Sequence, residues 1–251
     1  MLLRPTASLL ALAAPRLAPP LALSASRFGT KDYWNAQYAG DESASTEQSE
    51  ENGSSAGDKD FIPSERFSWY TGWEELAPFW AELVPDKEAQ VLLPGVGNDD
   101  AMVALYDAGW TRLCAFDYAP EAVERSRALF GERADSIELR VADARELPFN
   151  DGAYDAVLEK GALDSVFLSG EGEADQRLQL QRAVDELART VRVGGVVVSV
   201  TGFCDKIGRA FRDPTVWRCV RDGGFYITED GDATNSINAY FMAWVRVGEE
   251  E

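Results

Sequence analysis

The stretch VLLPGVGNDD, residues 91–100, decides how the fold of this chain is interpreted. It opens with an apolar run of strand length, continues with Gly95 and Gly97, and ends in polar residues at 98–100 that can cap a helix. Glycine lets a backbone turn sharply and approach a ligand closely. A strand, a glycine turn and a helix in this order are typical of a ligand-binding α/β sheet, although the same spacing also occurs in ordinary turns.

The rest of the chain alternates strand-like and helix-like segments. Strands are predicted at 89–95, 112–117, 137–143, 154–159, 194–202, 224–230 and 237–247. Helices are predicted at 67–84, 99–109, 119–131, 175–191 and 214–223. Continuous apolar strands that alternate with helices indicate a doubly wound, mostly parallel sheet with helices on both faces. The last two strands have no good helix between them, which predicts an antiparallel edge hairpin.

Composition excludes several classes of function. The chain has 251 residues, 45% of them apolar, and a formal net charge of −19. The charge argues against nucleic acid and anionic membranes as partners and favours a basic one, although excess acid also simply keeps a protein soluble. Histidine is absent, which removes imidazole catalysis and histidine-containing metal sites. Three cysteines without CxxC spacing suggest neither a zinc cluster nor a disulfide framework, so no metal is expected.

An acidic residue follows the glycine turn at an informative distance. Asp117 ends the second predicted strand, twenty residues after Gly97, where a carboxylate can bind the two hydroxyls of a ribose. A dinucleotide fold would normally carry a third glycine at position 100, where this chain has Asp100. A carboxylate there would repel a pyrophosphate. A nucleoside with a positive sulfonium suits this acidic pocket better, so we infer S-adenosylmethionine.

The third predicted strand ends in Asp143 and Ala144. Asp143 is placed to accept a hydrogen bond from an adenine amino group, and Ala144 offers a backbone donor. Asp143 can instead cap its own loop, because aspartate readily bonds to nearby backbone groups.

The fourth predicted strand ends in Glu159, Lys160 and Gly161. Glu159 can hold the amino-acid end of the cofactor or orient an incoming amine, and Lys160 is expected to act as an ion-pair partner rather than as a base. Asp164, about one helical turn further, can reach the same opening. A surface pair without function is the alternative, yet exposed ion pairs contribute only about 0–1 kcal/mol, so stability is a weak reason for one here.

The N-terminal part divides into three segments before the domain. Residues 1–30 contain three arginines and no acid, which is typical of a transit peptide, with the mitochondrion favoured over the plastid. The cytoplasm is expected if this segment is not a presequence. Residues 31–39 form an aromatic segment, 40–60 a disordered acidic linker, and 61–251 the main domain.

Five motifs in order resemble one enzyme superfamily: VLLPGVGND, CAFDYAP, RVADARELPF, YDAVLEKGALDSVF and VDELARTVRVGGVVVSVTG. They resemble the class I S-adenosylmethionine-dependent methyltransferases, which implies a Rossmann-like, seven-stranded sheet. The segments LEKGALD, KDYW and FSWYTGWEEL are most similar to the group that holds the elongation factor 1-alpha lysine methyltransferases and the mitochondrial citrate synthase lysine methyltransferase. One departure is Leu93, where many superfamily members carry an acid.

The motifs and the resemblance together give the expected site. The cofactor-binding residues are expected to be Gly95, Gly97, Asn98, Asp117, Tyr118, Asp143, Ala144 and Glu159. The expected catalytic residues are Glu159, Lys160 and Asp164. An aromatic acceptor channel is expected from Tyr33, Trp34, Trp69 and Tyr70, because apolar walls lower the pKa of an amine and aromatic faces hold its cation. Ordinary lid packing is the alternative for these aromatics.

Methyl transfer from a sulfonium needs alignment, exclusion of water and a deprotonated acceptor, but no dedicated nucleophile. A chain without histidine can therefore perform it. The leading hypothesis is a protein-lysine N-methyltransferase that acts on a basic protein surface. The alternatives are a small-molecule methyltransferase of an organelle and a catalytically inactive cofactor-binding assembly factor. The sequence leaves the oligomeric state undetermined.

Overall fold

The computed structural model describes residues 27–39, 68–221 and 239–248. The predicted acidic linker at 40–60, the predicted strand at 224–230 and all but the last few residues of the predicted transit peptide lie outside these ranges. A short 3-10 helix, η1 (Arg27–Gly29), and helix α1 (Lys31–Ala39) precede the main domain.

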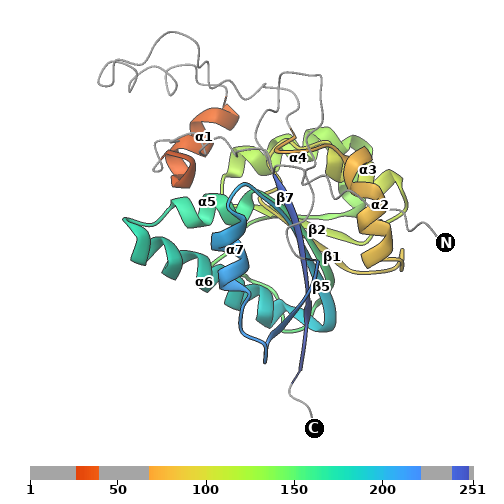
Figure 1. The fold of residues 1–251 in the computed structure, drawn as a ribbon. Helices are drawn as coiled ribbons and strands as arrows, with labels where there is room; N and C mark the ends of the chain where they lie inside the picture. Colours follow the sequence, from red (N-terminus) through yellow and green to blue (C-terminus); the bar gives the residue numbers. More distant parts are fainter. Residues whose placement is uncertain (1–26, 40–67, 222–238, 249–251) are drawn as a thin grey trace, which may run out of the picture.

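A seven-stranded sheet forms the centre of the domain, as Figure 1 shows, and confirms the predicted fold class. Its strands are β1 (Val91–Pro94), β2 (Leu113–Asp117), β3 (Glu138–Val141), β4 (Tyr154–Lys160), β5 (Val191–Thr201), β6 (Trp217–Arg221) and β7 (Tyr240–Arg246). The order across the sheet is β3-β2-β1-β4-β5-β7-β6. β1 to β5 are parallel, and β7 runs antiparallel to both of its neighbours. The strand order reverses between β1 and β4, where such sheets bind ligands.

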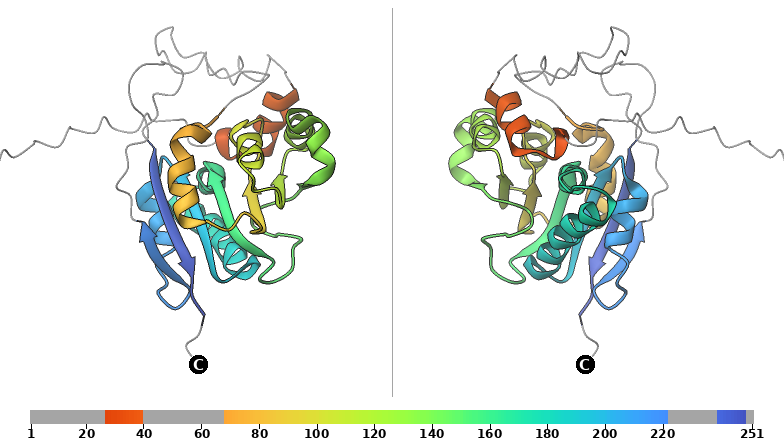
Figure 2. Two further views of the ribbon diagram at one scale, coloured as in Figure 1. Left: turned by 90° about the vertical axis from the view of Figure 1, so that its right-hand side faces the viewer. Right: turned by 90° about the vertical axis from the view of Figure 1, so that its left-hand side faces the viewer.

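Helices cover both faces of this sheet. The helices of the main domain are α2 (Trp73–Leu83), α3 (Ala101–Asp107), α4 (Pro120–Phe130), η3 (Gly131–Ser136), α5 (Ala162–Leu168), α6 (Glu173–Thr190) and α7 (Cys204–Ala210). In Figure 2, α2 and α3 lie on one face and α5, α6 and α7 on the other. Because successive strand residues point to opposite faces, Leu92 packs in one core and Leu93 in the other.

The predicted helix at 214–223 is wrong. This segment contains strand β6, which pairs antiparallel with β7, for example Trp217 with Arg246 and Cys219 with Trp244. Its β-branched and aromatic residues suit a strand, and pairing with a distant segment overrides the local helical pattern. The helix of this region, α7, comes earlier in the chain. The predicted antiparallel edge is confirmed, but β6 forms it with β7.

The predicted helix at 67–84 begins later than expected. Helix α2 starts at Trp73, and Gly72 is its N-cap. Tyr70 has a φ of +67°, which is incompatible with a right-handed helix. Leu76 and Trp80 lie one helical turn apart and are buried, whereas Trp69 lies in the preceding turn. This turn brings Tyr70 to the carboxyl edge of the sheet.

Candidate active site

The glycine loop after β1 and the end of β2 meet as predicted. Asp117 is buried, and its two carboxylate oxygens accept hydrogen bonds from the backbone N–H of Gly97 (3.1 Å) and of Ala119 (3.0 Å). Burial raises the pKa of Asp117 to about 6, although these hydrogen bonds favour its charged form. A carboxylate offers about four acceptor positions, so Asp117 retains capacity for two ligand hydroxyls.

Two glycines shape this loop by their conformation. Gly95 and Gly97 have φ values of +62° and +53°, which side chains disfavour. A Cβ atom added to Gly97 would lie 2.5 Å from the hydroxyl of Tyr38, so the loop is a cradle that only glycine leaves open. The Ser126 hydroxyl donates to the Gly97 carbonyl (2.6 Å) and fixes the loop from the side of α4. Asn98, also predicted, is buried beside Gly97, and Tyr118 is half-buried beside Asp117.

Asp143 makes an ion pair that the sequence analysis did not predict. Arg145 donates to it from Nε (2.9 Å), Nη2 (2.6 Å) and its backbone N–H (2.9 Å). Burial alone would raise the pKa of Asp143, but the bonds from Arg145 hold it below its usual value. The bond from the Arg145 backbone N–H is the loop-capping contact that was the alternative for Asp143. Binding of an adenine amino group by Asp143 stays a prediction. Ala144 is half-buried next to it.

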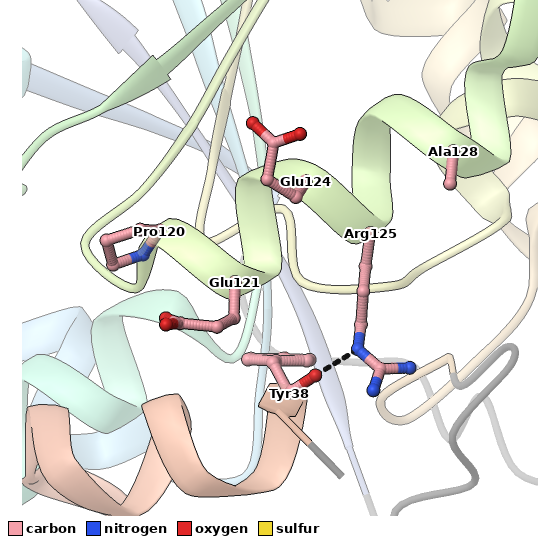
Figure 3. Close-up of a pocket in the computed structure, with 6 residues that line it drawn as sticks. All are labelled: Tyr38, Pro120, Glu121, Glu124, Arg125 and Ala128. Carbon is pink, nitrogen blue, oxygen red and sulfur yellow. Dashed lines mark hydrogen bonds between the residues drawn. The ribbon is translucent and has the colours of Figure 1, made fainter.

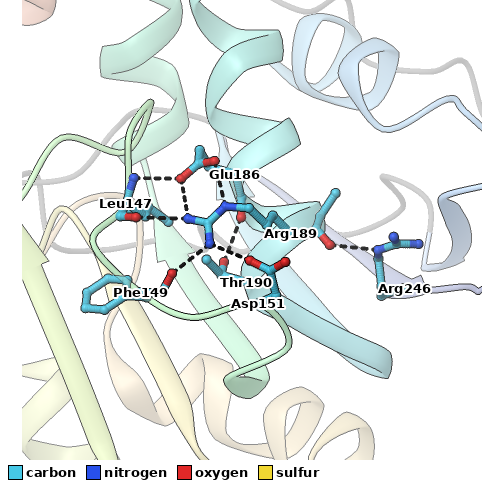
Figure 4. Close-up of polar contacts among 8 residues, drawn as sticks. Leu147, Phe149, Asp151, Glu186, Arg189, Thr190 and Arg246 are labelled. Atoms are coloured by element: carbon cyan, nitrogen blue, oxygen red, sulfur yellow. Dashed lines mark hydrogen bonds and ion pairs between the residues drawn. The ribbon is translucent and has the colours of Figure 1, made fainter.

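An arginine at the end of α6 fixes the loop that follows Asp143 (Figure 4). Arg189 donates to the carbonyls of Leu147 (2.9 Å) and Phe149 (2.7 Å) and to the carboxylates of Glu186 (2.7 Å) and Asp151 (2.9 Å). Glu186 in turn accepts from the Leu147 backbone N–H (2.7 Å). The Arg189 side chain thus holds the loop between β3 and β4 against α6.

We expect Arg189→Met to lower the free energy of unfolding by about 2–3 kcal/mol, because it removes charge-assisted hydrogen bonds and leaves carbonyls without donors. Urea unfolding measures this. Arg177→Met, on the exposed side of the same helix, removes an ion pair with Glu173 (2.7 Å) and a long hydrogen bond to the Glu173 carbonyl (3.4 Å), and should cost less than about 0.5 kcal/mol. Equal losses in the two variants would show that the Arg189 contacts do not hold the loop.

Two carboxylates lie together at the end of β4. Glu159 is fully buried; its carboxylate accepts from the Ser199 hydroxyl and from the Leu163 backbone N–H (3.2 Å). Asp164, buried in the first turn of α5, accepts from the hydroxyls of Thr201 and Tyr70, the latter at 2.5 Å. Within the described residues, no basic side chain is hydrogen-bonded to either acid. Two buried acids side by side without a cation suit a cationic ligand, which would favour their ionised forms.

The pKa values of this pair follow from its surroundings. Burial, with the neighbouring Asp164 as the next cause, raises the pKa of Glu159 to about 8. Burial also raises the pKa of Asp164, against the hydrogen bonds from Thr201 and Tyr70. At neutral pH, therefore, Glu159 holds its proton in a large share of molecules.

We expect the free energy of unfolding to fall as the pH rises from about 5 to about 8. In this window the folded chain keeps the proton of Glu159, and below about pH 6 that of Asp117, whereas the unfolded chain has already lost both. Glu159→Gln should flatten the slope, because glutamine does not titrate. Urea unfolding at several pH values measures this. A slope that Glu159→Gln leaves unchanged would contradict the assignment.

Tyr70 sits in a strained turn beside this pair. The Thr71 backbone N–H donates to the Trp69 carbonyl (2.7 Å), which with the positive φ of Tyr70 defines a γ-turn of the rare, strained kind. Such a conformation costs about 1–3 kcal/mol and persists where its surroundings impose it. The side chain of Tyr70 lies against Gly161 and Gly202: an added Cβ would be 3.1 Å from the ring at Gly161 and 3.1 Å from the hydroxyl at Gly202.

Lys160 points away from the carboxylate pair. Its ammonium donates to Asp99 Oδ2 (2.7 Å), to the Ser68 hydroxyl (2.6 Å) and to the Thr71 carbonyl (2.5 Å). The ion pair with Asp99 is buried. Lys160 therefore forms an ion pair, as expected, with a residue of the glycine loop, and its predicted catalytic role stays a prediction.

Helix α1 covers the site from the N-terminal side. Tyr38 is buried, and the proximity of Asp117 and Asp99 adds to the burial that raises the pKa of its hydroxyl. Figure 3 shows Arg125 of α4 donating to the Tyr38 carbonyl, with Glu121 on the same side of the helix. A hollow of about 420 Å³ opens between α1 and α4. Helix α1 is therefore fastened over the glycine loop as a lid.

The predicted acceptor aromatics divide into two groups. Tyr33, Trp34 and Trp69 pack with Phe28, with ring centroids 5.1 to 6.1 Å apart. Tyr70 alone reaches the carboxylates. The first group has the contacts of lid packing, and its acceptor role stays a prediction.

Among the described residues, no group of acidic and cysteine side chains could hold a metal ion. In that same part of the chain, none of the helices has the length and apolar character needed to cross a membrane.

Comparison with known proteins agrees with this arrangement. Residues 92–199 match the family described as "Methyltransferase domain". Over these residues the chain is similar to a methyltransferase domain, and its fold is that of the class I methyltransferases. The mouse "eEF1A lysine and N-terminal methyltransferase" is 29% identical over 172 residues, which are 68% of this chain but 21% of that protein. The mouse "EEF1A lysine methyltransferase 4" is 29% identical over 150 residues, 57% of each chain. This chain thus spans only about a fifth of the length of the first relative.

Solved methyltransferase structures share the fold of this chain. The geranyl diphosphate C-methyltransferase from Streptomyces coelicolor A3(2) superposes with a TM-score of 0.51 at 15% identity, covering 69% of this chain and 77% of that one. At this identity the likeness shows the fold alone.

S-adenosylmethionine is the cofactor of this methyltransferase class, and the residues present fit it. Gly95 and Gly97 form a backbone cradle, and Asp117 retains acceptor positions for ribose hydroxyls. The carboxyl groups of Glu159 and Asp164 would supply acceptors for the positively charged part of the cofactor.

Several site residues were missed from the sequence. Ser199 and Thr201 on β5 hold the two carboxylates, and their alternation in an otherwise apolar strand could have revealed them. Asp99 and Tyr38 carry no comparable local signal, because their roles depend on distant partners.

Proposed function

We propose that this chain is an S-adenosylmethionine-dependent protein-lysine N-methyltransferase. The observation that carries the proposal is the buried pair Glu159 and Asp164 at the end of β4, to which no described basic side chain is hydrogen-bonded. A protonated amine supplies the positive charge that such a pair requires.

The bound cofactor supplies the methyl group, and the residues of this chain align and prepare the acceptor. Asp117 and the loop of Gly95 and Gly97 hold the nucleoside side. Asp164 and Glu159 orient the acceptor ammonium, and the one that is ionised accepts its proton before the nitrogen attacks. The ring of Tyr70 forms one wall and keeps water out.

The relatives support a protein acceptor. Two of them carry names that state lysine methylation of eEF1A. The chain's charge of −19 favours a basic partner surface. Neither observation names the substrate of this chain, so the target protein is left to experiment.

Incubation of the full-length chain with radiolabelled S-adenosylmethionine and a mitochondrial extract tests the proposal. Label in a protein band after gel separation is the expected result, and Asp117→Ala should abolish it. Label only in extractable small molecules would favour a small-molecule methyltransferase. Cofactor binding without any transfer would favour an inactive assembly factor.

We further propose that the N-terminal segment directs the chain to mitochondria. Phe28 is buried against α1, and its carbonyl accepts from Trp34 Nε1 (2.7 Å), so the packed part of the chain begins before the predicted boundary at residue 30. Cleavage is therefore expected before Phe28. Expression of the tagged chain in cells, with microscopy and N-terminal sequencing of the mature protein, tests this. A cytosolic protein with an intact N-terminus would refute the proposal.

A further inference from the structure

We infer that Lys160 is a positioning residue that couples the glycine loop, through Asp99, to the turn that presents Tyr70. The kinetic test of this inference rests on the proposed function, whereas the hydrogen-exchange test requires only that S-adenosylhomocysteine binds. Its basis is the geometry around one ammonium group at the end of β4.

The ammonium of Lys160 has three N–H donors, and each has a different acceptor. One is Asp99, which belongs to the loop after β1; the others are the Ser68 hydroxyl and the Thr71 carbonyl, which lie on either side of Tyr70. Asp99 also accepts from Ser68 (2.9 Å) and from the Ala101 backbone N–H (2.9 Å). The loop and the turn thus share one buried ion pair.

The same geometry argues against Lys160 as a base. A base needs a free lone pair, and an ammonium group that donates to a buried carboxylate has none with which to accept a proton. In addition, successive strand residues point to opposite faces, so Lys160 and Glu159 lie on different sides of β4. Glu159 bonds to Ser199 and Leu163, which are not partners of Lys160.

Tyr70 is the element that this connection would move. Lys160 holds the strained turn through Ser68 and Thr71. The hydroxyl of Tyr70 bonds to Asp164 (2.5 Å), and its side chain lies against Gly161 and Gly202. A shift of the loop at Gly95 to Asp99 therefore reaches Tyr70 through a short chain of buried bonds. Ligand binding at the loop should therefore reduce the motion of the turn at 68–71, which holds the Tyr70 ring beside Asp164.

Hydrogen exchange in the presence of S-adenosylhomocysteine, without any acceptor, tests the coupling. In the wild type, the ligand should slow exchange of the backbone amides at 69–72 by about tenfold. Lys160→Met alone would leave Asp99 buried without its cation and can prevent folding. The double variant Lys160→Met with Asp99→Asn removes both charges, and ligand binding should no longer change exchange at 69–72. Lys206→Met, which removes a half-buried lysine 3.4 Å from Glu173 and far from the turn in the sequence, should behave as wild type.

Turnover gives the second readout. The double variant should bind S-adenosylhomocysteine within about threefold of wild type but lose about tenfold or more in kcat, with the same pH profile at lower height. Lys160→Arg, which keeps the charge, should recover part of kcat. Loss of one limb of the pH profile would make Lys160 a proton-transfer group, and unchanged ligand protection at 69–72 in the double variant would refute the coupling. A wild type that shows the coupling but labels no protein would refute the proposed function instead.

Discussion

Asp117→Ala is expected to abolish measurable cofactor binding, with a loss of at least about 100-fold in affinity for S-adenosylhomocysteine. The buried carboxylate accepts from the backbone of Gly97 and Ala119, so its removal both loosens the glycine cradle and deletes the acceptors for the ribose. Isothermal titration calorimetry measures the affinity. Unchanged affinity would refute the ribose assignment.

Asp155→Ala is the matched control for this variant. Asp155 also accepts a backbone hydrogen bond, from Gln90 (2.6 Å), and pairs with Arg192, but it lies near the start of β4. The opposite end of the strand carries the site. Removal of the Asp155 carboxylate should lower stability and leave cofactor affinity within about threefold, since no contact to the glycine loop is lost. Circular dichroism establishes that both variants are folded.

Glu159→Gln is expected to lower kcat by about 100-fold while cofactor affinity changes less than about fivefold. Glutamine has nearly the same shape, and its carbonyl and amide groups can still bond to Leu163 and Ser199, so folding should survive. What it loses is the ability to become negative beside the acceptor ammonium. Steady-state kinetics on the labelled acceptor, combined with calorimetry, separates the two effects.

Equal losses in turnover and in binding would remove the claim of Glu159 on the acceptor. Glu88→Gln, at an exposed position before β1, provides the control and should leave both quantities unchanged. Asp164→Asn should be more harmful than Glu159→Gln. Both oxygens of Asp164 accept hydrogen bonds, from Thr201, Tyr70 and the Gly202 backbone N–H, and an amide would place a donor against donors.

The cofactor side of this site could be predicted from the sequence because its signals are local. Gly97 and Asp117 stand at the ends of two neighbouring parallel strands, and strand geometry alone brings them together. The mostly parallel sheet with an antiparallel edge followed in the same way from the alternation of strands and helices and from the resemblance to the superfamily, whereas the order of its strands was not predicted.

The acceptor side could be predicted only in part, because it is built from long-range contacts. The direction of Lys160 depends on a turn at Ser68 to Thr71, far away in the sequence. The turn itself depends on a positive φ at Tyr70, which no local pattern announces. The strand at Trp217 was predicted as a helix for a related reason, since its pairing with β7 lies outside any local window.

The amino acid that carries the transferred label shows whether the acceptor of this chain is a lysine. The labelled protein band from the extract is hydrolysed to amino acids, and the radioactive products are separated by chromatography against methylated standards. We expect the label to elute with methylated lysine and Glu159→Gln to reduce it strongly. Label in another amino acid, or no label in protein at all, would contradict the assignment of Glu159 and Asp164 to a lysine acceptor.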